Sequence, residues 1–171
     1  MTPPRPGDPR TPDPARDPDA DTAAQELAQR CADAMWERDR ASRRLGMSRP
    51  VVAPGRATLT LLIGADLLNG QGYCHGGYLA TLADTAFAFA CNTGNEVTVA
   101  AGFDIVFVRP AREGDVVRAS AVERARFGRS GLYDVTITRS DGELIAEFRG
   151  RSRSLGRPLL PGHPGPGRPA G

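Results

Sequence analysis

The 171-residue sequence has little net charge, few cysteines and no long hydrophobic run. A net charge of +2 argues against nucleic acid as the main partner, because proteins that bind it usually carry a marked basic excess. The longest apolar run lies within Leu79–Cys91, is interrupted by Asp84, and is too short to cross a bilayer. Cys31, Cys74 and Cys91 form an odd set in a chain that begins without an apolar signal segment. These absences predict a cytoplasmic protein with reduced thiols, no disulfide framework and no membrane span.

Two proline-rich segments are predicted to flank one folded domain. Residues 1–21 and 156–171 contain few large apolar side chains, so they cannot bury enough surface to offset the entropy of ordering. The remaining residues, 22–155, have a length that suits a single domain, and no internal repeat is visible. His163 is one of only two histidines, but its place in the second tail makes it a poor candidate for catalysis.

Local patterns predict an α+β fold. Residues 22–45 place apolar side chains at helical spacing, and residues 78–92 are apolar nearly all round, which is typical of a buried helix. Short connections between the later strands favour an antiparallel sheet of about five strands packed against that helix. The predicted strands are residues 57–68, 97–108, 115–125, 131–138 and 143–154.

The start of the predicted buried helix combines a histidine with two glycines, Gly76 and Gly77. Glycine lets a backbone N–H approach a ligand closely, and a helix N-terminus offers unpaired donors and a partial positive charge. Such donors stabilise the oxyanion that develops on a carbonyl or thioester oxygen. The two glycines are therefore candidates for activating an electrophile.

Asp84 supplies a second chemical group on the same helix, two turns beyond Gly77. A carboxylate on an apolar helix is costly unless it is paired or used. Near a bound carbonyl carbon it can act as a nucleophile or as a general base for water. A hydrophobic surrounding would raise its pKa toward a useful range.

Each of these residues also has a structural interpretation, and composition and periodicity leave both open. A Gly-Gly pair often serves a turn, a helical Asp often finds a salt bridge, and a lone His often makes a structural hydrogen bond. The residues to which this applies are Asn69, Cys74, His75, Gly76, Gly77, Asp84 and Cys91. On these grounds alone, the stretch indicates a candidate acyl-transfer site.

The combination resembles the PaaI/PaaD family of phenylacetate-pathway acyl-CoA thioesterases, which have the hotdog fold. The resemblance rests on the pattern Asn69-Gly70-x-Gly72-x-x-His75-Gly76-Gly77, followed by LADTAFA at residues 82–88 and by Cys91-Asn92. Further similar segments, in the same order, are MWERDRASRRLGM, FVRPAREGD, GLYDV and AEFRGRSR, so the likeness covers residues 24–155. It implies an antiparallel sheet of five to six strands wrapped around one long central helix, with an N-terminal helix.

The resemblance also implies an activity and an assembly. It implies hydrolysis of (hydroxy)phenylacetyl-CoA or related acyl-CoA thioesters, in or beside phenylacetate degradation, with coenzyme A as part of the substrate and no further cofactor or metal. It implies a homodimer with a continuous sheet, and dimers that associate into a homotetramer. Each active site would combine Asp84 of one protomer with the Gly76 amide, His75 and Asn69 of the other.

Arginines near the last strands are candidates for the phosphates of coenzyme A, because a guanidinium binds phosphate through two parallel hydrogen bonds. Strand alternation predicts that Arg149, Arg151 and Arg153 lie on one face. We expect Gly77, Arg129, Arg149 and Arg151 to contact coenzyme A. A solvated surface is the alternative interpretation of these arginines.

Two other functions stay open at this point. A hotdog enoyl-thioester hydratase or dehydratase would pair a catalytic histidine with an acid, and a hotdog binding module would hold acyl-CoA without turnover. Some hotdog relatives position water with a hydroxyl on the strand that follows the helix, but Ala100, Ala101 and Gly102 offer none. Such a hydroxyl is either absent here or supplied by Thr85 or Thr98.

Overall fold

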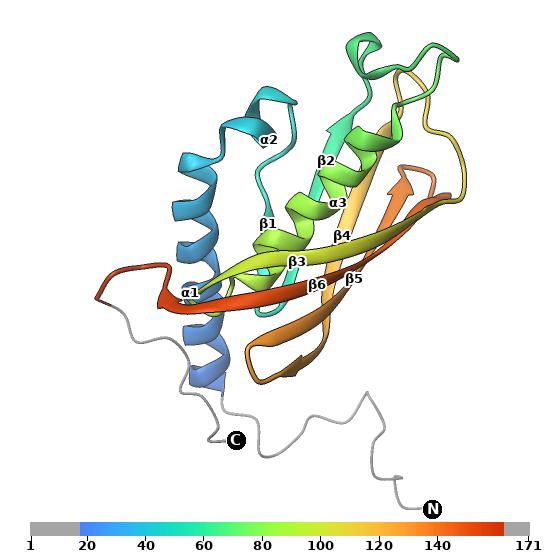
Figure 1. The fold of residues 1–171 in the computed structure, drawn as a ribbon. Helices are drawn as coiled ribbons and strands as arrows, with labels where there is room; N and C mark the ends of the chain where they lie inside the picture. Colours follow the sequence, from blue (N-terminus) through green and yellow to red (C-terminus); the bar gives the residue numbers. More distant parts are fainter. Residues whose placement is uncertain (1–17, 163–171) are drawn as a thin grey trace, which may run out of the picture.

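A six-stranded antiparallel sheet curls around helix α3 in the computed structural model, which describes residues 18–162 (Figure 1). The strand order is β1-β2-β4-β5-β6-β3, and every neighbouring pair is antiparallel. The helical elements are α1 (Pro18–Arg38), α2 (Arg40–Arg44), the 3-10 turn η1 (Ala65–Leu67) and α3 (Gly76–Cys91). The strands are β1 (Val51–Ala53), β2 (Arg56–Leu62), β3 (Glu96–Phe107), β4 (Val116–Phe127), β5 (Ser130–Arg139) and β6 (Leu144–Pro158). The α+β prediction is confirmed.

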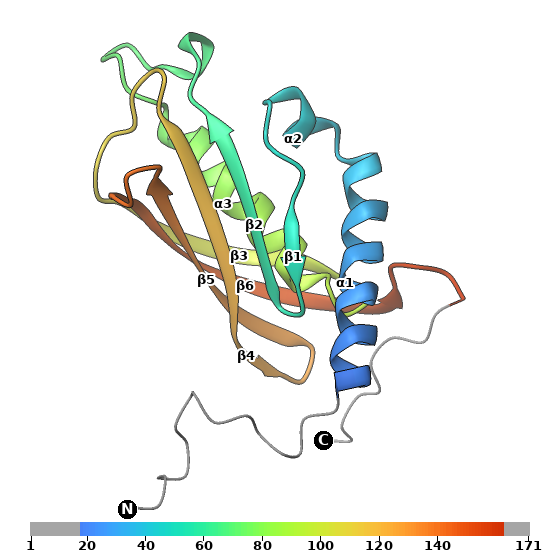
Figure 2. The same ribbon diagram turned by 180° about the vertical axis from the view of Figure 1, so that it is seen from behind.

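The N-terminal helix differs from the prediction at both ends. It begins at Pro18, four residues inside the segment expected to be a tail, and stops at Arg38 instead of continuing to residue 45. The break has a local cause: the Asp39 carboxylate accepts a hydrogen bond from the Ser42 N–H (3.0 Å) and starts the separate helix α2. Figure 2 places α1 beside β1, where Gln25 donates to the Val52 carbonyl (2.8 Å).

Two further element boundaries differ from the prediction. The strand predicted for residues 57–68 ends at Leu62, because the Leu67 N–H turns back to the Gly64 carbonyl and forms η1. Strand β6, predicted to end at residue 154, continues past the predicted domain boundary at residue 155 to Pro158. Beyond it, Leu160 donates to the side chain of the buried Asn95 (2.7 Å). The short strand β1 was not predicted. The disorder predicted for residues 1–17 and 163–171, and His163, lie outside the described residues.

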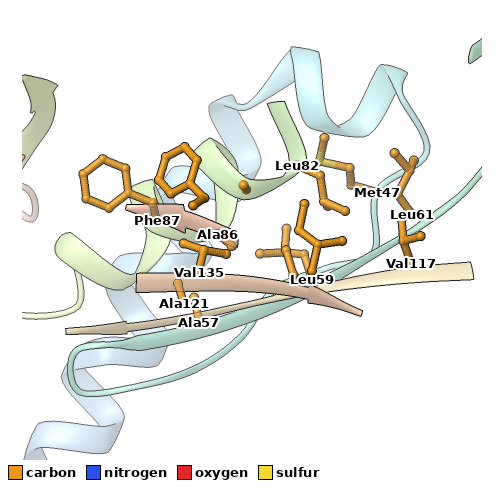
Figure 3. Packing of buried hydrophobic residues seen from close by; sticks show 14 of the residues in the cluster. Met47, Ala57, Leu59, Leu61, Leu82, Ala86, Phe87, Val117, Ala121 and Val135 are labelled. Atoms are coloured by element: carbon orange, nitrogen blue, oxygen red, sulfur yellow. The ribbon is translucent and has the colours of Figure 1, made fainter. Parts of the chain in front are cut away.

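The core lies between α3 and the concave face of the sheet. Leu82, Ala83, Ala86 and Phe87 are fully buried, as expected for a helix that is apolar nearly all round. The Phe87 ring packs against Tyr133, with ring centroids 5.3 Å apart. Figure 3 shows this helix face above the side chains of β2, β4 and β5. Ala83, Ala86 and Ala90 of this helix are all at most 1% exposed.

Strand β3 forms a long free edge of the sheet within the part of the chain that the structure describes. Its one recorded neighbour is β6. Apolar side chains along and just beyond it are well exposed, including Val99 (43%), Phe103 (41%), Val106 (64%) and Phe107 (49%). A long apolar edge with unpaired backbone groups is a template for pairing with another strand.

Candidate active site

The loop from Asn69 to His75 is fixed by hydrogen bonds before it enters α3. The Asn69 side-chain oxygen accepts from the N–H groups of Gln71 (2.9 Å) and Tyr73 (3.2 Å). The Cys74 N–H donates to the Ala111 carbonyl (2.8 Å) and the His75 N–H to the Leu67 carbonyl (2.9 Å). Asn69 therefore shapes the loop, which is the turn role that the sequence left open, and the loop holds the start of α3 in one position.

His75 caps α3 and selects which glycine amide stays free. Its Nδ1 accepts a hydrogen bond from the Gly77 N–H (3.0 Å), and its carbonyl accepts from the Tyr78 N–H (2.9 Å). The Gly76 N–H has no acceptor among residues 18–162. Of the two glycines, Gly76 is thus the candidate donor for an oxyanion, whereas the Gly77 N–H is already used. Because Nδ1 accepts, a neutral His75 ring carries its proton on Nε2, which it can donate to a ligand.

Asp84 lies in the middle of α3 as a half-buried carboxyl without a partner. Its Oδ1 atom is inaccessible and makes no hydrogen bond within the described residues. Burial raises the pKa of Asp84 above its usual range. A buried acceptor left unsatisfied destabilises a protein by about 1–3 kcal/mol. Such a group is therefore a strong candidate for a role in chemistry.

The Gly76 amide and the Asp84 carboxyl of one protomer are too far apart to act on the same atom. Asp84 lies eight positions after Gly76 in α3, which corresponds to about 12 Å along the helix axis. A thioester carbonyl carbon must lie within about 3–3.5 Å of its attacking atom. The two groups can act together only if a second copy of the chain brings its Asp84 to this Gly76.

The threonines considered as water-positioning groups already have other partners. The Thr85 hydroxyl lies 3.3 Å from the Ser42 hydroxyl on α2, and the Thr98 hydroxyl donates to the Glu96 carbonyl (2.9 Å). This geometry favours the interpretation that the site lacks a strand hydroxyl dedicated to water. Asp84 would then have to act on its water, or on the thioester, without such help.

The candidate coenzyme A arginines are all engaged elsewhere in this structure. Arg149 and Arg151 alternate with buried residues on the outer face of β6, as predicted. Arg149 binds Asp134 through two bonds (2.7 and 3.0 Å), and Arg151 binds Asp104 (2.6 Å). Arg129 donates twice to the Ser154 carbonyl (3.1 and 2.9 Å), which is a structural role. Contact between these arginines and coenzyme A stays a prediction.

Sequence reasoning missed Phe107, whose ring lies beside Gly76. A methyl group added to Gly76 would come within 2.9 Å of Phe107 Cζ and 3.1 Å of Cε2. Both residues line a cavity of about 290 Å³. A larger cavity of about 470 Å³ lies at the opposite end of α3, beside Cys91. The segment FVRPAREGD includes Phe107, but no local pattern marks it as a site residue, because its neighbour Gly76 belongs to a distant segment.

The described residues contain no group of three or more His, Cys, Asp or Glu side chains arranged to hold a metal ion. Within the same part of the chain, no helix is long and apolar enough to cross a membrane.

A helix wrapped by an antiparallel sheet, with a free amide at its start and an acid in its middle, defines the hotdog class of thioesterase-like proteins. Residues 71–146 match the thioesterase superfamily. The chain is 40% identical to the acyl-coenzyme A thioesterase PaaI of Escherichia coli K12 over 125 residues, which cover 73% of this chain and 89% of PaaI. The chain therefore belongs to the thioesterase superfamily, and within it to the PaaI-type acyl-CoA thioesterases.

Solved structures agree with this assignment. The structure of the E. coli PaaI protein from the phenylacetic acid degradation operon superimposes with a TM-score of 0.77 at 38% identity, covering 79% of this chain and 98% of PaaI. The TT0310 protein of Thermus thermophilus superimposes with a TM-score of 0.65 at 37% identity, covering 68% and 98% of the two chains. The hotdog fold predicted from the sequence is confirmed.

Proposed function

We propose that this protein hydrolyses acyl-CoA thioesters and that its preferred substrates carry arylacetyl groups such as phenylacetyl or hydroxyphenylacetyl. The observation that carries the proposal is that α3 holds both a free Gly76 N–H and an unpartnered, half-buried Asp84 carboxyl. The name and operon of the E. coli relative support the choice of acyl group and a place in or beside phenylacetate degradation.

The chemistry follows from these two groups. The thioester carbonyl oxygen accepts a hydrogen bond from the Gly76 N–H, which stabilises the oxyanion as the carbon becomes tetrahedral. Asp84 either takes a proton from a water that attacks the carbon, or attacks the carbon itself and forms an anhydride that water then opens. In both routes the C–S bond breaks, coenzyme A leaves as a thiolate, and the free acid is released. The His75 Nε2–H is placed to orient the thioester or the water.

Pairing of two protomers completes the site in this proposal. The exposed apolar edge of β3 supports a homodimer in which the two sheets become continuous. Asp84 of one protomer would then face the Gly76 amide of the other. Association of dimers into a homotetramer and the need for no cofactor beyond the substrate come from the family resemblance, and a cytoplasmic location comes from the cysteine content of the sequence. All three are parts of the same proposal.

The decisive assay is thiol release from a panel of acyl-CoAs. The panel comprises acetyl-, hexanoyl-, decanoyl-, phenylacetyl- and hydroxyphenylacetyl-CoA, and we expect the highest kcat/KM for the arylacetyl members. Tight acyl-CoA binding with no thiol release would favour a binding module, and hydration of an enoyl-CoA would favour a hydratase. A single turnover in H₂¹⁸O separates the two hydrolytic routes, because only the anhydride route can place label in the Asp84 carboxyl.

The pH dependence of kcat/KM should report the raised pKa of Asp84. The carboxylate form is the active one in both routes, so activity should fall as the pH drops through the Asp84 pKa. Because burial raises that pKa, the midpoint of the acid limb should lie above the value of about 4 that is typical of an exposed aspartate. A limb centred at or below pH 4 in the wild-type profile would contradict the assignment.

A further inference from the structure

We propose that the cavity beside Gly76 binds the acyl group of the substrate and that Phe107 sets the size of acyl group accepted. This inference rests on the proposed thioesterase function and assigns its specificity to one side chain. Phe107 is the last residue of β3, and its partner in β6 is the fully buried Ala146. The Phe107 side chain therefore points to the concave side of the sheet, toward the start of α3.

The cavity and the free amide are adjacent. The cavity has a volume of about 290 Å³, and its lining includes Gly76, Tyr73, Leu79, Phe107, Val108 and Pro110. The ring of Phe107 lies directly against Gly76. The carbonyl carbon of a thioester carries two substituents, the acyl chain and the sulfur of coenzyme A. When its oxygen binds the Gly76 N–H, one of these two substituents lies at the mouth of the cavity.

The charged groups near the cavity already have partners within the protomer. The Arg109 guanidinium pairs with Glu143 at 3.0 Å, and the Arg112 guanidinium lies over the ring of Tyr73, 4.8 Å from its centroid. The Cys74 thiol points to the His75 carbonyl, and burial raises the pKa of Cys74 to about 11. Nothing among the described lining residues calls for an anionic or strongly polar ligand.

Polarity decides which arm of the thioester enters this cavity. The pantetheine arm carries two amides and a hydroxyl, and burial of such groups without hydrogen-bond partners is costly. The acyl arm is apolar and gains free energy when it leaves water. The acyl group therefore occupies the cavity, and the pantetheine arm runs toward solvent.

The volume indicates a compact acyl group. An apolar protein cavity of about 150 Å³ is enough to hold benzene. A cavity of about 290 Å³ has room for an aromatic ring with a short linker. Two of its walls are the rings of Tyr73 and Phe107, and aromatic rings pack favourably against one another.

Phe107 is the wall that sets the limit. Leu79 is 3% exposed and belongs to the core, and Tyr73 is held under Arg112. Phe107, in contrast, is 49% exposed, while its backbone is fixed by β3 pairing and by the next residue, whose N–H donates to the Ile145 carbonyl (2.8 Å). Its side chain can change without disturbing the core, so its size governs the space beside Gly76.

The test compares Phe107→Ala and Phe107→Trp with wild type on acetyl-, phenylacetyl- and decanoyl-CoA. We expect Phe107→Ala to raise the ratio of kcat/KM for decanoyl- over phenylacetyl-CoA about tenfold or more, and Phe107→Trp to lower the ratio of phenylacetyl- over acetyl-CoA by a similar factor. Val51→Ala is the control, because Val51 is 73% exposed and lies on β1, at the opposite edge of the sheet from β3. It should leave both ratios unchanged.

A binding experiment keeps the inference testable even without turnover. Calorimetry measures the affinity for free coenzyme A, which has only the pantetheine arm, and for S-(2-phenylethyl)-CoA, an unreactive thioether that also carries an arylalkyl group. The difference between the two affinities reports the contribution of that group. Phe107→Ala and Phe107→Trp should change the affinity for the thioether and leave that for coenzyme A unaltered. Equal changes for both ligands would place the pantetheine arm in the cavity and overturn the inference, as would unchanged selectivity and affinity in both variants. Hydrolysis by the wild type would still support the thioesterase function in either case.

Discussion

Replacing Asp84 with asparagine should lower kcat/KM for phenylacetyl-CoA by about a hundredfold or more. The asparagine side chain has nearly the same shape, but its amide neither attacks a thioester nor accepts a proton from water at neutral pH. Thiol release under subsaturating substrate measures the loss. Asp66→Asn makes the same chemical change at an exposed position in η1 and should retain full activity. Activity within tenfold of wild type in Asp84→Asn would assign the chemistry to another group.

The same substitution should not weaken the fold, which separates a chemical from a structural loss. Because the pKa of Asp84 is raised in the folded protein, the folded state retains a proton that the unfolded chain has released. Stability is therefore lost as the pH rises from the ordinary carboxyl pKa through the raised one. Asparagine removes this dependence, so at neutral pH the midpoint of urea unfolding should be equal to or higher than that of the wild type.

Replacing Gly76 with proline should lower kcat by about 10²–10³, the usual loss when one oxyanion donor is removed. Proline lacks the N–H, yet it suits the first position of a helix. His75 has φ −62° and ψ 129°, which is the extended backbone favoured before proline. The new ring atoms do crowd Phe107, however, so the clash needs a control of its own.

Gly76→Ala is that control, because its Cβ meets Phe107 at 2.9 Å while the N–H is retained. We expect Gly76→Pro to be at least about tenfold less active than Gly76→Ala, with both proteins folded by circular dichroism. Equal activities would mean that the crowding of Phe107, and not the missing donor, is responsible. The activity of Gly76→Ala also shows whether the Phe107 ring can move away from an added Cβ.

Mixing the two inactive variants should restore activity if the active site is shared. In a mixed dimer of Asp84→Asn and Gly76→Pro, one site combines both damaged groups and the other combines both intact ones. Random pairing makes half of the dimers mixed, so co-expressed chains should recover about a quarter of wild-type activity. Differently tagged chains, purified on both tags in turn, would isolate the mixed species. Absence of recovery in that species would place Asp84 and its amide donor within a single chain.

The sequence predicted the helix of the site better than its surroundings. The largely apolar character of residues 78–92 and the Gly-Gly pair before them located α3 to within two residues. The same stretch identified Asp84 as a carboxyl among apolar side chains. This was possible because its neighbours on the helix are also its neighbours in the sequence. The break at Asp39 was harder to foresee, since helical spacing continues across a capping residue that forms only one side-chain bond.

The contacts of Phe107 and the arginines depend on the register of the sheet. Phe107 reaches Gly76 only because β3 pairs with β6 in a particular alignment. The acids that bind Arg149 and Arg151 come from β5 and β3. Strand periodicity predicted which face these arginines occupy, but it could not predict which carboxylates lie opposite.

The position of Phe107 at the end of a strand, with Gly76 and Asp84 both on a helix, has an evolutionary consequence. In the proposed mechanism, bond cleavage depends on α3, whereas the choice of acyl group depends on a side chain from the margin of the sheet. A substitution at that margin alters which substrate is accepted while the reacting groups keep their places. Descendants of such a scaffold can thus acquire new substrates without first rebuilding their catalytic groups.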